Sequence, residues 1–217
     1  MRSFLPDIPF YSVHLERETL REPFMTHLQN CLGHQITVWA ASEGKEVAAR
    51  GWPRGHPHES QTSIGALGCL DSHIRLLENM ITQRQPVIGI FEDDAECICQ
   101  IPSLDGFFDS VNAVNPKWDI LFLGANEWVD YEAVAKGIVR VSRFWGTHAF
   151  LIRESAVRCV LQDFRDLLAK GYAYPADWLY AYSIQKHGLK AYGPTLCKSM
   201  IRQKPGLVSA INGKIRT

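Results

Sequence analysis

Three adjacent acids, Glu92, Asp93 and Asp94, follow directly after the apolar run at residues 87–91. The run predicts a buried strand, and like charges at its end repel one another unless a cation or water lies beside them. An extended backbone directs Glu92 and Asp94 to one side and Asp93 to the other, so two carboxylates can converge on one ion. Hard oxygen ligands suit Mg²⁺ or Mn²⁺. The pattern alone leaves a metal site and a solvated acidic turn equally open.

Alternating strands and helices must position these acids. Strands are expected over residues 8–15, 35–42, 86–91, 118–125 and 189–197, with two extended segments over 137–154 that meet near Gly146. Helices are expected over residues 16–33, 64–81, 103–114, 154–170 and 174–188, and residues 43–60 show no periodicity and predict a loop. This order predicts one α/β domain over residues 1–217, with a central mixed, mostly parallel sheet flanked by helices and a basic tail from about residue 200. In such sheets ligands bind beyond the carboxyl ends of the strands, where the acids lie.

Composition and charge exclude several classes of protein. The 217 residues are 46% hydrophobic and carry 23 Lys and Arg against 23 Asp and Glu, so no global positive field favours nucleic acid as a partner. No run of about 18 apolar residues predicts a membrane span, and the amino-terminal segment lacks the core of a secretory signal. The six cysteines are scattered instead of forming a compact disulfide framework, which fits a reducing compartment. We therefore expect a cytoplasmic protein, with association to a membrane surface left open and the oligomeric state undetermined.

Several segments occur in an order that resembles glycosyltransferase family 25, the lipooligosaccharide and collagen galactosyltransferase type. The matching segments are "FYSVHLERETLRE", "VWAASEGKE", "IGALGCLDSH", "FEDDA", "WDILFLGA" and "GTHAFLI", and the correspondence covers roughly residues 8–211. The resemblance implies a GT-A fold, in which an acidic strand end holds a divalent ion against a nucleotide-sugar diphosphate. It also implies inverting transfer of galactose or another hexose from a nucleotide-sugar donor, expected to be UDP-linked, to a hydroxyl of a glycan or protein acceptor.

The resemblance assigns roles to four acids. It implies that Asp94 and Glu92 are ligands of Mn²⁺ or Mg²⁺, with Asp94 the first choice, while Glu92 or Asp93 can instead reach the ribose or the donor sugar. Asp177 matches the family's aspartate at the start of a late helix and becomes the candidate base that takes the proton of the acceptor hydroxyl. An ordinary helix cap is an equally good interpretation of Asp177.

Further candidates surround the expected nucleotide. Ser72 and His73 are expected near the donor, although His73 also fits a hydrogen-bonded core histidine. Arg17 is expected to position the nucleotide by its charge, whereas Arg21 is interpreted as part of a solvated helix face. His148 lies in the family's Gly-Thr-His-Ala segment, where it either contacts phosphate or metal or orients a neighbour by a hydrogen bond.

The remaining motifs give weaker signals. Gly65 and Gly68 would each cost about 1 kcal/mol in a helix relative to Ala, so we expect them where another backbone packs closely. Cys69 is interpreted as a small buried residue, and Cys97 and Cys99 as structural residues. The pair His56 and His58 has a spacing that can hold a metal ion, but without a nearby cysteine we assign this loop to the acceptor side.

One departure from the family keeps other functions open. The tail retains Gln203, Ser209 and Ile211 but has Ala210 where the family commonly has an acid. A catalytically silent carbohydrate- or partner-binding module is therefore an alternative. A metal-dependent nucleotidyltransferase or phosphohydrolase is another, although the sequence lacks the Gly-rich phosphate loop that would favour it.

Overall fold

The computed structural model describes residues 8–56, 61–99 and 101–207. The helices are η2 (Thr19–Arg21, a 3₁₀ turn), α1 (Glu22–Leu32), α2 (Gly44–Ala49), α3 (Ile64–Thr82), α4 (Ile101–Val114), α5 (Glu154–Ala169) and α6 (Ala176–His187). The strands are β1 (Phe10–His14), β2 (Ile36–Ala40), β3 (Val87–Glu92), β4 (Ala95–Cys97), β5 (Ile120–Gly124), β6 (Glu127–Ala135), β7 (Ile138–Trp145), β8 (Ala149–Arg153), β9 (Ala191–Pro194) and β10 (Ile201–Gln203). The expected strands and helices are all present, and the α/β class is confirmed.

The main sheet has eight strands in the order β2-β1-β3-β8-β5-β9-β7-β6. Strands β2, β1 and β3 pair in parallel, and β9 pairs in parallel with β5. Strand β8 runs antiparallel between β3 and β5, and β7 runs antiparallel between β9 and β6. All strands of the sheet except β8 and β7 therefore run in one direction. The mixed, mostly parallel sheet that the sequence predicted is confirmed.

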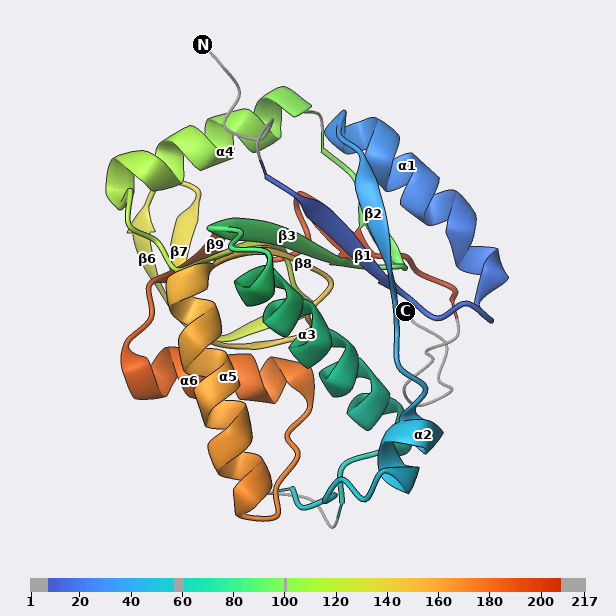
Figure 1. Ribbon diagram of the computed structural model, residues 1–217. Coiled ribbons are helices and arrows are strands. Elements are labelled where there is room, and N and C mark those ends of the chain that lie inside the picture. The colour runs from blue at the N-terminus through green and yellow to red at the C-terminus, as the bar shows by residue number, and fades with distance from the viewer. Residues whose placement is uncertain (1–7, 57–60, 100, 208–217) are drawn as a thin grey trace.

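Helices cover both faces of this sheet (Figure 1). One core lies between the sheet and helices α3, α5 and α6, and the other lies between the sheet and helices α1 and α4. Ile88 and Ile90 of β3 belong to the first core and Phe91 to the second. Because side chains alternate between the faces and both faces are covered, the apolar run at residues 87–91 is buried on each side, as expected of an inner parallel strand.

Two parts of the fold differ from the sequence-based expectation. Helix α2 lies in the segment that was expected to be a loop, where six residues are too few to show a helical period and buried Val47 is its main apolar anchor. Strand β6 was missed because Trp128 is its one buried residue and the other residues are exposed, apolar ones included, so it lacks the alternation of a half-buried strand. It forms a hairpin with β7, and Gly137 supplies the left-handed conformation of the turn, with φ 80°.

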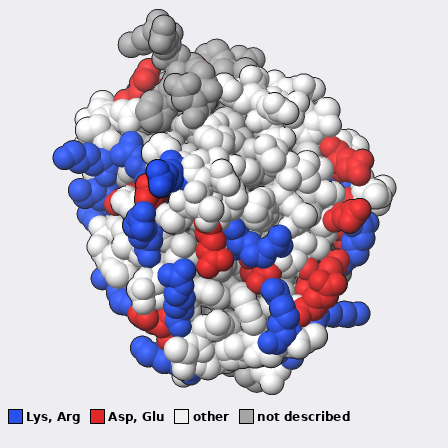
Figure 2. All heavy atoms as spheres, in the orientation of Figure 1, with Lys and Arg blue, Asp and Glu red and all other residues white. Residues whose placement is uncertain are grey.

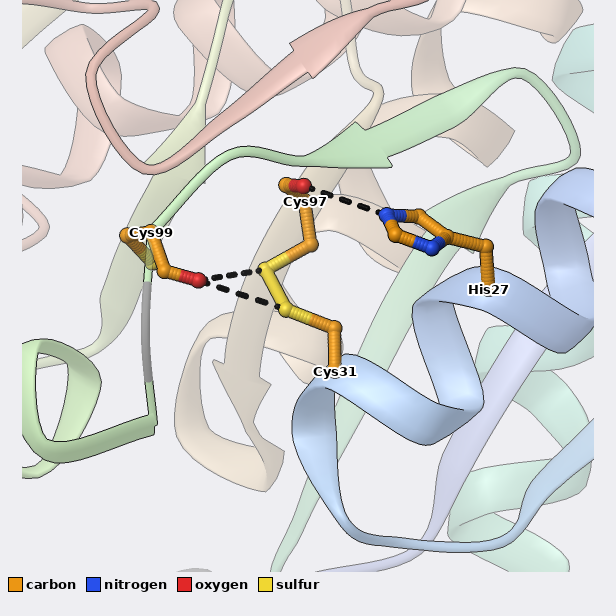
Figure 3. Close-up of a disulfide and its surroundings, with 4 residues drawn as sticks. All are labelled: His27, Cys31, Cys97 and Cys99. Carbon is orange, nitrogen blue, oxygen red and sulfur yellow. Dashed lines mark hydrogen bonds between the residues drawn. A yellow bond between two sulfur atoms is a disulfide. The ribbon is translucent and has the colours of Figure 1, made fainter.

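A small second sheet pairs β4 with β10 antiparallel, and a disulfide joins β4 to helix α1. Cys31 of α1 and Cys97 of β4 form this disulfide, next to His27 and the carbonyl of Cys99 (Figure 3). The scattered spacing of the cysteines did not predict the pairing, because the two residues lie 66 positions apart. Cysteine usage therefore no longer supports a reducing compartment, and the cytoplasmic location stays a prediction.

The surface and the helices agree with the charge and hydropathy of the sequence. Figure 2 shows Lys and Arg interspersed with Asp and Glu on the face in view. Within the described ranges, no helix is both long enough and apolar enough to cross a bilayer.

Candidate functional site

The candidate site lies at the edge of the sheet where strands β1, β2 and β3 end. Because these strands are parallel, their last residues, His14, Ala40 and Glu92, share this edge. Strand β8 is antiparallel and therefore enters the sheet here, preceded by the segment 146–148. The backbone N–H of Glu92 donates to the carbonyl of His148 at 3.1 Å, which fixes that segment beside the acids.

Two cavities open at this edge. The charged cavity has a volume of about 70 Å³, and its lining includes Arg17, Arg21, Ser72, His73, Asp93 and Asp94. The aromatic cavity has a volume of about 500 Å³, and its lining includes His56, Trp145, Thr147, His148, Asp177 and Trp178. Cys69 and Glu92 line both cavities and so mark the place where they meet. The expectation that Cys69 is simply buried is wrong, because it is only partly buried there.

Asp93 belongs to a buried cluster of charged residues. Its carboxylate accepts hydrogen bonds from Arg21 at 2.5 Å and contacts Nδ1 of His14 at 2.8 Å. Burial lowers the pKa of Arg21, but the charges of Asp93 and Asp94 outweigh this effect and the pKa is raised from its ordinary value. The interpretation of Arg21 as part of a solvated helix face is wrong, because its side chain is only 7% exposed.

Asp94 shares the same guanidinium. Its Oδ2 lies 3.6 Å from Arg21 and accepts a hydrogen bond from the side-chain amide of Gln203 at 2.9 Å. Asp93 and Asp94 therefore both face the guanidinium of Arg21. The expectation that Asp93 points to the opposite side from Glu92 and Asp94 is wrong. The physical reason is that β3 ends at Glu92 and the next two residues form a turn, to which the strand period does not apply.

Arg17 and Ser72 both line the charged cavity, and their expected contacts with a nucleotide stay predictions. The two side chains differ in exposure. The Arg17 side chain is 52% exposed and pairs with Glu43, which is also partly exposed. Ser72 is buried and holds two segments together, because its hydroxyl donates to the carbonyl of Gly68 at 2.6 Å and accepts from the N–H of Ser42 at 2.8 Å. Ser72 is therefore well placed to fix the wall of the cavity.

Gly68 permits the close packing of residues 42–44 against the start of α3. A Cβ atom at Gly68 would lie 2.5 Å from the carbonyl oxygen of Ser42 and 2.8 Å from the backbone nitrogen of Gly44. The expected role of Gly68 in close backbone packing is confirmed. This contact brings the loop after β2 against the start of α3 and closes one side of the charged cavity.

His73 is buried between the sheet and α6. Its Nδ1 lies 3.1 Å from the hydroxyl of Tyr180, and its ring stacks on Phe150 with an interplanar angle of 7°. Burial lowers the pKa of His73 to about 4, so its imidazole is neutral at physiological pH. Its Nε2 has no hydrogen-bond partner among the described residues. The core-histidine interpretation thus accounts for one ring nitrogen and leaves the other unexplained.

Asp177 lies in the wall of the aromatic cavity, in the first turn of α6. Its Oδ2 accepts from the N–H of Gly146 at 3.1 Å and its Oδ1 accepts from the N–H of Trp178 at 2.9 Å. Burial raises the pKa of Asp177, and the backbone N–H groups and His56 oppose that rise only in part. The helix cap itself is Pro175, so capping alone does not account for Asp177.

Aromatic side chains form much of the wall around Asp177. The ring of Trp178 lies 5.3 Å from that of Trp145 and 5.2 Å from that of His56, measured between centroids. The guanidinium of Arg143 lies over both tryptophan rings. Sequence reasoning missed these tryptophans, although each stands within one residue of Gly146 or Asp177. His56 lines the aromatic cavity, and its assignment to the acceptor side stays a prediction. His58, Ser209, Ala210 and Ile211 lie outside the described residues.

Glu92 and His148 lie close together at this edge of the sheet. His148 belongs to the segment that precedes β8, and its carbonyl accepts the N–H of Glu92. Thr147 donates a hydrogen bond from its hydroxyl to Oε1 of Glu92 at 2.6 Å. His148 is buried and contributes to the wall of the aromatic cavity. The structure thus brings Glu92 and His148 together with Asp177 around one cavity, and Arg17, Ser72, His73, Asp93 and Asp94 around the other.

Comparisons with known proteins connect this geometry to a family. A family model described as glycosyltransferase family 25 (LPS biosynthesis protein) matches residues 7–144. The lacto-N-neotetraose biosynthesis glycosyltransferase LgtE of Neisseria meningitidis serogroup B is 25% identical over 143 residues, which cover 59% of this chain and 50% of LgtE. The chain therefore spans about half the length of this curated relative.

Solved structures with similar folds have low sequence identity. A glycosyltransferase involved in the glycosylation of the major capsid of PBCV-1 matches with a TM-score of 0.47 and 11% identity, over 87% of this chain and 81% of the other. The protein A197 from STIV matches with a TM-score of 0.45 and 9% identity, over 94% of this chain and 96% of the other.

Proposed function

Because the chain belongs to glycosyltransferase family 25, we propose that it transfers a hexose from a nucleotide-sugar donor to a hydroxyl of a glycan or glycosylated-protein acceptor. The proposed donor is UDP-linked, and the proposed hexose is galactose or a close relative. The observation that carries the proposal is the meeting of two cavities at Cys69 and Glu92, one charged and one aromatic. Each substrate then has a cavity of its own, and the reacting atoms meet at the junction.

The charged cavity suits the nucleotide diphosphate. Arg17 is exposed and pairs with exposed Glu43, so a phosphate oxygen can replace the Glu43 carboxylate by side-chain rotation alone. At about 70 Å³ the cavity is smaller than the usual range of about 300–1,000 Å³ for ligand sites. Donor binding is therefore expected to separate Arg17 from Glu43 and widen the cavity.

The aromatic cavity suits the acceptor sugar and the base. Asp177 takes the proton of the acceptor hydroxyl while the new bond to the sugar C1 forms on one face. The bond from C1 to the diphosphate oxygen breaks on the opposite face, so the configuration at C1 inverts and the nucleoside diphosphate leaves with the bonding electrons. Trp145 and Trp178 offer apolar ring faces for the acceptor sugar beside that base.

The divalent ion that was predicted at Asp94 and Glu92 stays a prediction. A divalent cation beside Asp94 would face the guanidinium of Arg21 and would have to displace the amide of Gln203. These residues fit a divalent ion poorly, and no step of the proposed reaction is assigned to one. If an ion does bind there, Asp94→Asn is expected to abolish metal-dependent donor binding, as calorimetry with UDP and Mn²⁺ would measure.

A screen of sugar nucleotides tests the proposed function. The protein is incubated with UDP-hexoses and other sugar nucleotides, with and without glycan acceptors, in Mn²⁺ and in EDTA. The proposal predicts release of UDP that rises when an acceptor is present. Binding of UDP without turnover on any acceptor would favour the silent module instead. Release of pyrophosphate or inorganic phosphate in place of UDP would favour the nucleotidyltransferase or phosphohydrolase.

A further inference from the structure

We propose that Cys69, His73 and Glu92 form a binding site for a borderline divalent transition-metal ion, with Zn²⁺ as the best fit. One ligand atom from each residue lies within 4.8 Å of the other two. A thiolate, an imidazole and a carboxylate are the ligand types that Zn²⁺ accepts together, whereas a thiolate disfavours Mg²⁺ and Mn²⁺. The site shares Glu92 with the one predicted at Asp94 and Glu92, but Cys69 and His73 replace Asp94 and change the ligand chemistry.

Two of the three ligands come from one face of α3. Cys69 and His73 are four residues apart, so they lie one above the other on the helix surface. Glu92 is the last residue of β3 and faces this part of α3 where the two cavities meet. A rigid helix and the end of an inner strand therefore hold the ligand set.

His73 supplies the strongest independent sign of a ligand. The residue is 1% exposed, and its Nε2 has no hydrogen-bond partner within the described part of the chain. Burying a polar nitrogen without a partner is destabilising, so such atoms are rare in native proteins. Because Nδ1 is engaged by Tyr180, Nε2 is the nitrogen left for an ion. The stacking on Phe150 fixes the plane of the ring.

Outer contacts orient the other ligands in the way that metal sites require. Thr147 donates to Oε1 of Glu92 and holds the carboxylate in place. The Tyr180 hydroxyl lies 3.1 Å from Nδ1 of His73 and orients the imidazole, and with the ring proton on Nδ1 donated to this hydroxyl, Nε2 keeps its lone pair for an ion. Cys69 is partly exposed and lines both cavities, which gives an ion a route from solvent. Three protein ligands leave a fourth position for water or a substrate oxygen, as in catalytic zinc sites.

Titration with Co²⁺ and Zn²⁺ tests the site without any sugar nucleotide. We expect one Co²⁺ per chain, with a sulfur-to-cobalt charge-transfer band that Zn²⁺ abolishes by displacement. Cys69→Ser should lose the band. The matched control is Cys159→Ser, which removes a partly buried thiol of α5 that forms no disulfide, and it should keep the band. Absence of the band in the folded wild type, or its survival in Cys69→Ser, overturns the proposal.

Two further variants separate this site from its neighbours. Tyr180→Phe removes only the hydroxyl that orients His73 and is expected to weaken Zn²⁺ binding by about 10–100-fold. Asp94→Asn is expected to keep Zn²⁺ affinity, because Asp94 is not a ligand here. The opposite pattern, with affinity lost in Asp94→Asn and kept in Tyr180→Phe, would refute the assignment. Circular dichroism checks that each variant is folded. Since no donor is present, failure of this test leaves the proposed transfer reaction untouched, and the reverse also holds.

Discussion

Two aspartates on opposite sides of the junction have different surroundings. Asp93 is 5% exposed, accepts a hydrogen bond from Arg21 and contacts Nδ1 of His14. Asp177 lies in the wall of a cavity of about 500 Å³, and its closest donors are the backbone N–H groups of Gly146 and Trp178. The Asp93 carboxylate is paired with the positively charged guanidinium of Arg21. The Asp177 carboxylate accepts hydrogen bonds from backbone N–H groups, which carry partial charges, and lines a cavity that an acceptor can enter.

The difference separates a structural acid from a candidate base. The Asp93 carboxylate is already engaged by a buried guanidinium and an imidazole, so it is poorly placed to receive the proton of a substrate hydroxyl. A carboxylate whose pKa is raised by burial binds a proton more readily, as a general base requires. The comparison therefore assigns Asp93 to the stability of the site and Asp177 to its proposed chemistry.

The largest effect is expected from Asp177→Asn on turnover. Loss of a general base lowers kcat by about 100- to 10,000-fold, which corresponds to about 2.7–5.4 kcal/mol in the barrier. Donor affinity should change little, because Asp177 lies in the aromatic cavity. Steady-state kinetics together with UDP calorimetry measure the two quantities, and near-wild-type turnover in Asp177→Asn would place the base elsewhere.

The same variant should keep its stability. The raised pKa of Asp177 means that the folded state favours the protonated form, so this group's contribution to stability falls as pH rises through the raised pKa. A neutral Asn removes that cost at pH 7 but leaves one of the two backbone N–H groups, of Gly146 or Trp178, without an acceptor. The two effects oppose each other, so the melting temperature should change little. Asp119→Asn is the matched control for turnover, because Asp119 lines neither cavity and its carboxylate accepts hydrogen bonds from Ser155 and from the N–H of Lys190.

The next largest effect is expected from Arg21→Met on folding. Removal of the guanidinium leaves Asp93 buried without its main partner, and breaking a buried pair in this way costs about 3–5 kcal/mol in the free energy of unfolding. Arg17→Met is the matched control, since the exposed pair with Glu43 is worth at most about 1 kcal/mol. Urea denaturation measures both.

A double variant sharpens that result. Arg21→Met combined with Asp93→Asn removes both charges and should recover part of the stability that Arg21→Met alone loses. If Arg21→Met and Arg17→Met lost the same free energy of unfolding, the pair between Arg21 and Asp93 would not behave as a buried ion pair. The contrast between Asp93 and Asp177 would then fail.

The edge of the sheet could be predicted from the sequence because it depends on local patterns. The apolar run before Glu92 marks a buried strand, and parallel strands bring their carboxyl ends to one edge. The helical spacing around His73 similarly marks α3. These features need only the periods of strand and helix, and the structure confirms the corresponding elements.

The partners across that edge could not be predicted, because they depend on contacts between distant segments. Arg21 lies on a 3₁₀ turn whose phase differs from that of the expected helix, and Asp93 is 72 residues away. Cys31 meets Cys97 across a similar distance. The environment of Asp177 likewise depends on Gly146, which follows a different strand. Spacing shows which residues share an element but not which elements meet.

A smaller effect is expected from Trp178→Ala on the acceptor. Loss of the indole removes a ring face beside Asp177 and should raise the acceptor KM by about 10-fold, or about 1.4 kcal/mol, with little change in the donor KM. Tyr131→Ala controls for the general loss of an aromatic side chain, since Tyr131 is 52% exposed on β6 and does not line the aromatic cavity. An equal rise in both KM values would argue against separate cavities for the two substrates.

The smallest effect is expected from His56→Gln on the pH dependence. The acid limb of kcat/KM should lie above the pH at which an ordinary aspartate titrates, because burial raises the pKa of Asp177. The charge of His56 opposes that rise, so its removal should raise the pKa of Asp177 further and move the acid limb to higher pH. Arg21 lies beside Asp93 and not beside Asp177. Arg21→Met should therefore leave the pH of the acid limb unchanged under conditions in which the variant is folded. A limb that moves with Arg21 and not with His56 would reverse the roles of the two aspartates, because the titrating base would then lie on the charged side of the junction.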